Sequence, residues 1–347
     1  MGRDNRHSAG EGGQGILPTL LEELERCKAG GDASGMGWAF AKIGTFYQTQ
    51  GKDREALSFF EESLKAFRDL GDKPGEASVS ALMGHLLYQQ GAWDRALESL
   101  DHARRLQEEL ADRAGLAATL GKMGNACEGK LGWEQALQCY RQSMEIKQEL
   151  GDRAGLALTW NNIGTLQAKT EQWAEALEAY GQSRVIQEEL GDLRGLSIIF
   201  GNIGRVYHQK GEWREAAAHY ENSCSLHEAV EDALGRATIL NSLGLVRKEM
   251  GDLDGAKETY ERAIQILRER DDLLRLTVLM HNLAIVHEEK GEYRKALSLL
   301  EEVISLDKRM GNPDLKRDML VFRRIRRRMS MERDLQAESW GREPGDR

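Results

Sequence analysis

Proline, cysteine and long apolar runs are all scarce in this chain. Its 347 residues include only four prolines, and these lie outside the helices predicted below or near their starts. None of the four cysteines forms a CxxC pair, so we expect a reducing compartment rather than a disulfide framework. No apolar run is long enough to cross a membrane.

Targeting signals are also missing. Residues 1–15 are polar and rich in glycine, unlike a signal peptide. Met1 and Gly2 begin as an acylation signal does, but Arg6 stands where serine or threonine is needed. We therefore expect a cytoplasmic protein.

The usual sequence signatures of catalysis are absent. The eight histidines form no HExxH motif and do not accompany cysteines at zinc-ligand spacing. There is no P-loop, and no candidate nucleophile has a base beside it. We predict that the protein is not an enzyme and holds neither a metal nor a cofactor.

What the chain does have is one 40-residue pattern, repeated seven times without a gap. A period of this size indicates a solenoid of stacked helix pairs. When each repeat is numbered from Gly37 and its equivalents, position eight is small: Gly44, Gly84, Gly124, Gly164, Gly204, Gly244 and Ala284. Position twenty is always alanine: Ala56, Ala96, Ala136, Ala176, Ala216, Ala256 and Ala296. Position twenty-four is always large: Phe60, Leu100, Tyr140, Tyr180, Tyr220, Tyr260 and Leu300.

These residue types fit a pair of closely packed helices. Trp160, Ile163 and Gly164 fall on one face of the first helix. The glycine costs about 1 kcal/mol of helix stability relative to alanine, but it lets the second helix approach closely. The alanine at position twenty is the matching small residue, and the large residue at position twenty-four fills the space between successive repeats. Leu-Gly-Asp triplets such as residues 150–152 supply a left-handed helix end and the N-cap of the next helix.

The pattern resembles the tetratricopeptide repeat (TPR), which has the same small residue at position eight, alanine at twenty and aromatic at twenty-four. The 40-residue variant is similar to the repeats of Pins/LGN proteins and of kinesin light chain. The resemblance covers residues 16–315. It implies an all-α fold, a right-handed superhelix (α-solenoid) of helix-turn-helix repeats whose first helices line a concave groove.

The resemblance also divides the chain. Residues 1–15 are expected to be disordered. The TPR array over 16–315 would begin with a half repeat at 16–34, followed by seven repeats over about 35–314.

The last segment is basic. Residues 316–330 form a predicted helix in which an apolar stripe, Val321, Phe322, Ile325 and Met329, is surrounded by arginine. We expect this helix to cap the open end of the array, as solenoids require. The alternative is that it binds nucleic acid or an acidic membrane surface. Residues 331–347 are expected to form a flexible tail.

Amides occupy positions that face the groove in TPR arrays. Asparagine at position six resembles the asparagine ladder of long TPR superhelices, and its amide can pair with one peptide unit of an extended ligand. The alternative is that these amides satisfy neighbouring helix ends. The groove amides are Asn161, Asn162, Asn202, Asn241 and Asn282, with Asn125 at position nine.

Basic residues accompany the amides, although the net charge of the chain is −9. The basic groove residues of the first six repeats are Lys42, Lys122, Lys169, Arg205 and Lys248, and His208 faces the same groove. They are opposed by Glu128 and Glu249 only, while the last repeat carries Glu288 and Glu289. A basic lining favours an acidic segment of a partner protein.

Two classes of function fit this sequence. The first is a non-catalytic protein–protein interaction scaffold or adaptor that binds an extended, acidic peptide segment in the groove. The second is a regulatory sensor whose superhelix tightens around a peptide or another ligand. For either class we expect a protein or peptide partner, no nucleic acid and no insertion into a membrane.

Overall fold

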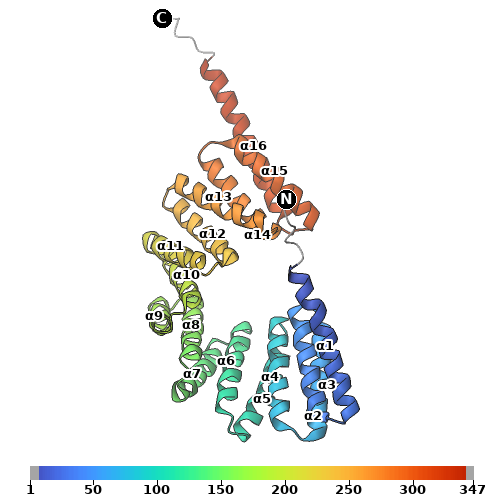
Figure 1. Ribbon diagram of the computed structural model, residues 1–347. Coiled ribbons are helices and arrows are strands. Elements are labelled where there is room, and N and C mark those ends of the chain that lie inside the picture. The colour runs from blue at the N-terminus through green and yellow to red at the C-terminus, as the bar shows by residue number, and fades with distance from the viewer. Residues whose placement is uncertain (1–7, 341–347) are drawn as a thin grey trace, which may run out of the picture. The chain divides into compact units, whose positions relative to one another are not determined.

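The computed structural model describes residues 8–340, and the side chains of residues 15–333 within that range. All regular structure there is α-helical, in sixteen helices joined by short turns (Figure 1). The helices are α1 (Ser8–Gly30), α2 (Ala33–Thr49), α3 (Asp53–Leu70), α4 (Lys73–Gln89), α5 (Trp93–Glu109), α6 (Arg113–Gly129), α7 (Trp133–Leu150), α8 (Arg153–Lys169), α9 (Trp173–Leu190), α10 (Leu193–Gln209), α11 (Trp213–Ala229), α12 (Ala233–Glu249), α13 (Leu253–Glu269), α14 (Leu273–Glu289), α15 (Tyr293–Met310) and α16 (Leu315–Trp340). None of the described helices combines the length and apolar character needed to span a bilayer.

The chain divides into two compact units, residues 1–179 and 180–347, with the boundary inside α9. In the first unit α2 packs on α3, α4 on α5 and α6 on α7. In the second unit α10 packs on α11, α12 on α13 and α14 on α15. Each pair is one predicted repeat, so the all-α fold of stacked helix-turn-helix repeats is confirmed.

The turns between helices follow from the Gly-Asp signals in the sequence. Gly71 and Gly151 both end their helices in the left-handed conformation, with φ near 69°. The aspartate that follows is the N-cap of the next helix: the side chain of Asp72 accepts a hydrogen bond from the Gly75 amide at 3.0 Å. Where glycine is replaced, as at Glu231, the residue still adopts a positive φ of 55°. The cap geometry therefore persists in repeats that lack the glycine.

The small residue at position eight sets the spacing within each helix pair. A Cβ atom on Gly124 would lie 2.4 Å from the Tyr140 ring, so the ring of α7 rests directly on the backbone of α6. Tyr140 is fully buried, and it shares an apolar cluster with Ile163 and Leu166 of the following repeat. The large residue at position twenty-four thus packs both within its own repeat and against the next one.

The two ends of the chain differ from the sequence-based expectation. Helix α1 begins at Ser8, so it includes residues 8–15 of the segment expected to be disordered; the low helix propensity of its glycines concealed it. Residues 1–7 lie outside the described residues. Helix α16 continues beyond 330 to Trp340, because residues 331–340 contain no helix breaker. The rest of the expected tail, 341–347, also lies outside the described residues.

Candidate functional site

The candidate site is the first-helix face, defined here as repeat positions 2, 5, 6, 9, 12 and 13 of the even-numbered helices α2 to α14. Residues at positions 12 and 13 of successive repeats contact each other. In the first unit Gln48 Nε2 donates to Gln89 Oε1 at 2.8 Å, and Lys169 pairs with Glu128. In the second unit Lys248 Nζ lies 3.8 Å from Glu289 Oε1. Polar side chains 41 residues apart therefore link neighbouring first helices.

A further contact between neighbouring repeats joins positions 5 and 6. Asn282 Nδ2 donates to Asn241 Oδ1 at 2.9 Å, from α14 to α12. In this pair the amides are joined side chain to side chain rather than to a helix end. Asn161 and Asn202 also make polar contacts, and Asn202 Oδ1 accepts from the Arg205 guanidinium at 3.1 Å. Asn162 is half-buried on α8.

Local contacts occupy two further predicted site residues. Asn125 Oδ1 accepts a hydrogen bond from the Tyr140 hydroxyl at 2.6 Å. Burial and the neighbouring Glu128 carboxylate raise the pKa of Tyr140, so the hydroxyl remains a donor. The His208 ring packs edge-on against Trp213 at 5.4 Å, and burial lowers the pKa of this histidine.

Carboxylates offset most of the basic residues expected to line the groove. Lys42 pairs with Glu23 of α1 at 2.7 Å, and Lys248 also lies 3.3 Å from Glu249. With the Lys169–Glu128 pair, these contacts neutralise three of the five basic positions. The count of charges by position set Glu128 and Glu249 against these lysines, but it could not show which carboxylate contacts which lysine, and it left out Glu23 of α1.

Lys122 is different. It is half-buried on α6, burial lowers its pKa, and within residues 15–333 no carboxylate offsets its charge. His85 of α4 faces it: burial and then the Lys122 charge lower the pKa of this imidazole. The His85 ring also stacks on Tyr88 at 6.4 Å. This part of the first-helix face is therefore a desolvated cation beside a neutral imidazole.

An apolar component of the face was not predicted. A pocket of about 300 Å³ between α12 and α14 is lined by Leu274, Val278 and Leu279, and Asn241 is also among its lining residues. Leu274 and Val278 are 60% and 37% exposed. Position two carries large exposed apolar side chains in four repeats: Trp38, Leu158, Ile198 and Val278. An apolar residue at a groove position was the signal that could have revealed this feature.

The structure corrects the prediction that Glu288 lines the groove. Instead of facing a ligand, it is buried by α16, where Arg324 and Arg328 contact its two oxygens at 2.6 and 2.8 Å. The repeat pattern could not indicate this contact, because Arg324 and Arg328 belong to α16, which follows the last repeat.

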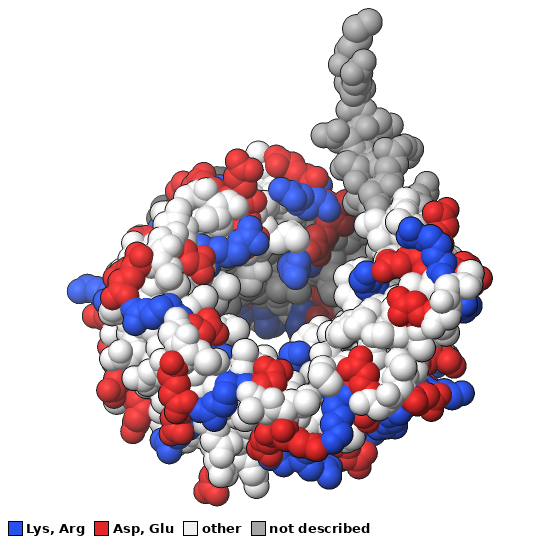
Figure 2. All heavy atoms as spheres, turned by 60° about the horizontal axis from the view of Figure 1, so that its bottom comes forward, with Lys and Arg blue, Asp and Glu red and all other residues white. Residues whose placement is uncertain are grey.

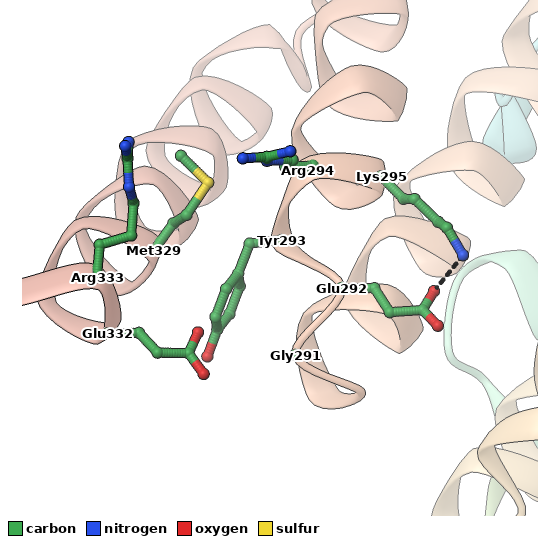
Figure 3. A pocket seen from close by; sticks show the side chains of 8 residues that line it. All are labelled: Gly291, Glu292, Tyr293, Arg294, Lys295, Met329, Glu332 and Arg333. Atoms are coloured by element: carbon green, nitrogen blue, oxygen red, sulfur yellow. Dashed lines mark hydrogen bonds and ion pairs between the residues drawn. The ribbon is translucent and has the colours of Figure 1, made fainter. Parts of the chain in front are cut away.

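Beside this contact, a shallow pocket of about 490 Å³ lies where α15 begins and α16 passes it (Figure 3). It is lined by Tyr293, Arg294, Glu332 and Arg333, so both signs of charge face it. Lysine and arginine are likewise mixed with aspartate and glutamate over the surface drawn in Figure 2. The described surface in that view therefore has no large area of a single sign.

The described residues contain no group of three or more histidine, cysteine, aspartate or glutamate side chains placed to hold a metal ion. The first-helix face offers hydrogen bonding by amides, the Lys122 cation without a carboxylate, the Arg205 guanidinium hydrogen-bonded to Asn202, and apolar contact. These are the means by which proteins bind other polypeptides.

Comparison with known protein families identifies the repeat. The family model for the tetratricopeptide repeat matches residues 35–109, 75–149, 155–229 and 235–309, which together make up most of the chain. The chain belongs to the tetratricopeptide repeat family. A search of curated proteins found no match.

Solved structures of other TPR-like proteins share the fold. BtubC (BKLC) from P. vanneervenii has a TM-score of 0.57 and 21% identity, over 65% of this chain and 92% of that chain. A signal transduction ATPase with a tetratricopeptide repeat sensor, from Pyrococcus horikoshii, has a TM-score of 0.68 and 14% identity, over 88% and 48%. A variant of a putative kinesin light chain from Podosopora anserina has a TM-score of 0.50 and 15% identity, over 58% and 98%. At these identities the likeness concerns the fold alone.

Membership of the TPR family fixes the broad class of function. TPR arrays are in general non-catalytic scaffolds that bind other proteins, and no catalytic family matched this chain. The chain is therefore a protein-interaction protein in this broad sense.

Proposed function

We propose that this TPR protein binds an extended, acidic segment of a partner protein on its first-helix face. The observation that carries the proposal is Lys122, a half-buried cation with no carboxylate to offset it in the described chain. Removing a charge from water is costly unless an opposite charge accompanies it. A carboxylate of the ligand would supply that charge, and the other lysines of the face already have theirs.

The paired amides support an extended ligand. The Asn241–Asn282 hydrogen bond uses one donor and one acceptor, and each amide offers two donors and a carbonyl oxygen. The pair therefore retains N–H and C=O groups for the peptide units of a bound segment. Pairing also holds both side chains in position before the ligand arrives, which lowers the entropy cost of binding.

The apolar pocket adds a requirement for the segment. Because the pocket of about 300 Å³ lies beside Asn241, a backbone that meets the amides can place an apolar side chain between Leu274 and Val278. Burying such a side chain contributes about 1.5–3 kcal/mol. The part of the ligand that meets the second unit thus carries at least one large apolar residue.

The test is to capture a partner with the wild-type protein and to measure its affinity for variants by calorimetry. Lys122→Glu should weaken binding about tenfold or more, since it places like charges together, and should reduce the salt dependence. Lys130→Glu is the matched control, because Lys130, the residue that directly follows α6, is an exposed lysine that pairs with Asp94. Asn282→Ala should weaken binding only about fivefold, as expected for one hydrogen bond.

Equal affinities for the Lys122→Glu and Lys130→Glu variants would contradict the acidic ligand. Unchanged binding by Asn282→Ala would show that the amide pair is structural. If a free peptide binds and compacts the array in small-angle scattering while no protein partner is captured, the protein is a regulatory sensor instead.

A further inference from the structure

Cys127 of α6 and Cys139 of α7 occupy two repeat positions that contact each other elsewhere in the chain. They are positions 11 and 23, twelve residues apart across one helix pair. In the first repeat Tyr47 and Phe59 stack at 5.4 Å, and in the fifth Tyr207 and His219 stack at 5.3 Å. In the sixth repeat, the Arg247 guanidinium donates to the hydroxyl of Thr259 at 2.7 Å. The repeat geometry alone therefore brings the side chains of positions 11 and 23 together.

In the third repeat both positions are cysteine, so the repeat geometry brings the two thiols together, and each thiol shifts the pKa of the other. Gly124 and Ala136 bring α6 and α7 close together at this level, as the contact of Gly124 with the Tyr140 ring shows. A disulfide requires Cα atoms within about 7 Å, so it needs two helices that pack closely at this level. Neither cysteine is buried, and both line an open cleft of about 640 Å³ between α5, α6 and α7.

We propose that Cys127 and Cys139 form a reversible disulfide when the protein meets a peroxide. The proposal is independent of the first-helix face. Two thiols without a third ligand are poorly suited to hold zinc, and no group of three or more candidate ligands occurs in the described residues. Thiol–disulfide chemistry needs only the pair.

The two thiols have different roles in the reaction. The hydrogen bond from Cys139, followed by the charge of Lys130, lowers the pKa of Cys127 to about 7, so this sulfur is the nucleophile. The same hydrogen bond and burial raise the pKa of Cys139, which keeps its proton. The Cys127 thiolate attacks hydrogen peroxide, the O–O bond breaks, and a sulfenic acid and hydroxide form. Cys139 then attacks the sulfenic sulfur; its proton and the sulfenic hydroxyl leave as water. In total two thiols and one peroxide give one disulfide and two waters.

The experiment uses the reduced full-length chain, treated with hydrogen peroxide, alkylated and digested with trypsin. Cleavage after Lys122, Lys130 and Arg141 places the cysteines on separate peptides, residues 123–130 and 131–141. We expect these two peptides to be recovered linked, with the loss of two hydrogen atoms, and to separate on reduction. Cys127→Ser should abolish the link. Cys224→Ser is the control, because Cys224 is buried and burial raises its pKa to about 11.

A second measurement tests the thiol contact itself. In the wild-type protein the alkylation rate of Cys127 should reach half its maximum near pH 7. Cys139→Ala removes the hydrogen-bond donor, so the midpoint should rise toward the ordinary thiol value of about 8.5. Recovery of unlinked peptides, with Cys127 either alkylated or oxidised to the sulfinic acid, overturns the proposal. An unchanged midpoint in Cys139→Ala overturns it as well.

Discussion

Gly121 and Gly124 lie one helical turn apart on α6 in opposite surroundings. A Cβ atom on Gly124 would meet the Tyr140 ring at 2.4 Å, whereas one on Gly121 would have only Ser143 Oγ nearby, at 3.7 Å. Gly124→Ala should therefore destabilise the protein by about 1–3 kcal/mol through overpacking. Gly121→Ala should stabilise it by up to about 1 kcal/mol through helix propensity. Urea unfolding of the two variants measures both effects, and the same sign for both would show that Tyr140 is free to move.

For single residues, the sequence predicted the packing positions well and the pairing of charges poorly. The glycine at position eight and the alanine at position twenty could be assigned because each recurs at 40-residue spacing. Whether Lys122 or Lys169 has a carboxylate partner could not be predicted, because both are lysines at groove positions of the first-helix face. Only the structure shows that Glu128, 41 residues before Lys169, offsets that charge while Lys122 has no such partner.

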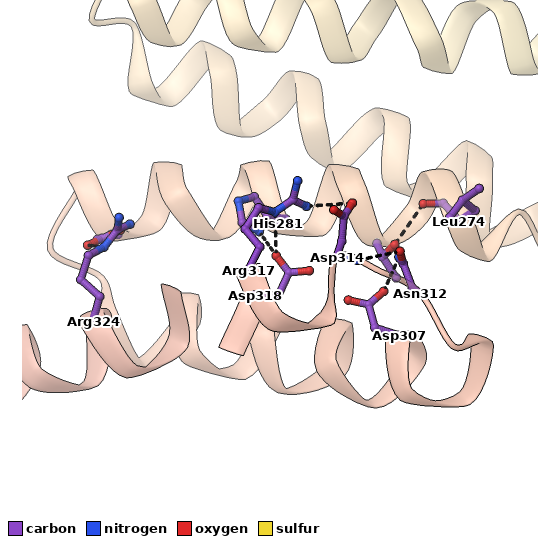
Figure 4. Close-up of polar contacts among 10 residues, drawn as sticks. Leu274, His281, Asp307, Asn312, Asp314, Arg317, Asp318 and Arg324 are labelled. Carbon is purple, nitrogen blue, oxygen red and sulfur yellow. Dashed lines mark hydrogen bonds and ion pairs between the residues drawn. The ribbon is translucent and has the colours of Figure 1, made fainter. Parts of the chain in front are cut away.

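The docking of α16 depends on a cluster of polar groups from three elements (Figure 4). Asp307 of α15 is fully buried, and Asn312 Nδ2 donates to its Oδ1 at 2.7 Å. Asp318 of α16 lies 2.5 Å from His281 Nδ1 of α14 and 3.3 Å from the Arg317 guanidinium. Burial, followed by the hydrogen bond to Asp318, raises the pKa of Asp307 to about 6.

This raised pKa predicts how the contact responds to pH. The folded chain favours protonated Asp307, so its contribution is full below the ordinary value of 3.8 and is lost as the pH rises through about 6. Asp307→Asn keeps the acceptor for Asn312 and supplies a permanent donor toward Asp318. The variant should protect α16 amides from hydrogen exchange more strongly than wild type at pH 8, with little difference at pH 4. If Asp307→Asn changes the hydrogen exchange of α16 equally at pH 8 and at pH 4, the titration of Asp307 does not control the contact.

Element boundaries were predictable where a specific turn residue marks them. Leu150, Gly151 and Asp152 located the end of α7 and the start of α8, because a left-handed glycine and an aspartate cap have few other roles in adjacent positions. At the two ends of the chain no such signal exists. The extents of α1 and α16 were therefore underestimated, and the apolar stripe containing the buried Ile325 was the only guide to the contact of α16 with α15.

At the scale of the whole molecule, stability is a sum of contacts between neighbours, because a solenoid has no central core. Ala176 of α9 is fully buried, so Ala176→Arg should overpack the helix and bury a charge. Hydrogen exchange should accelerate in α8 and α9 first and in the adjacent repeats next, while α2 and α14 keep their protection. Ala174→Arg is the matched control, since Ala174 is exposed on the same helix. Uniform loss of protection along the chain would mean that the array unfolds as a single cooperative unit.

The contacts between residues 41 positions apart also bear on how such an array lengthens. A side chain at position 12 reaches position 13 of the following repeat, as Lys248 reaches Glu289. Residues 233–272 carry both complementary halves, Lys248 at position 12 and Glu249 at position 13. A tandem gene duplication of this segment would therefore place a lysine against a glutamate at the new junction. Such a repeat can be copied without first acquiring a compensating mutation, whereas a copy of residues 273–312 would set Glu288 against Glu289.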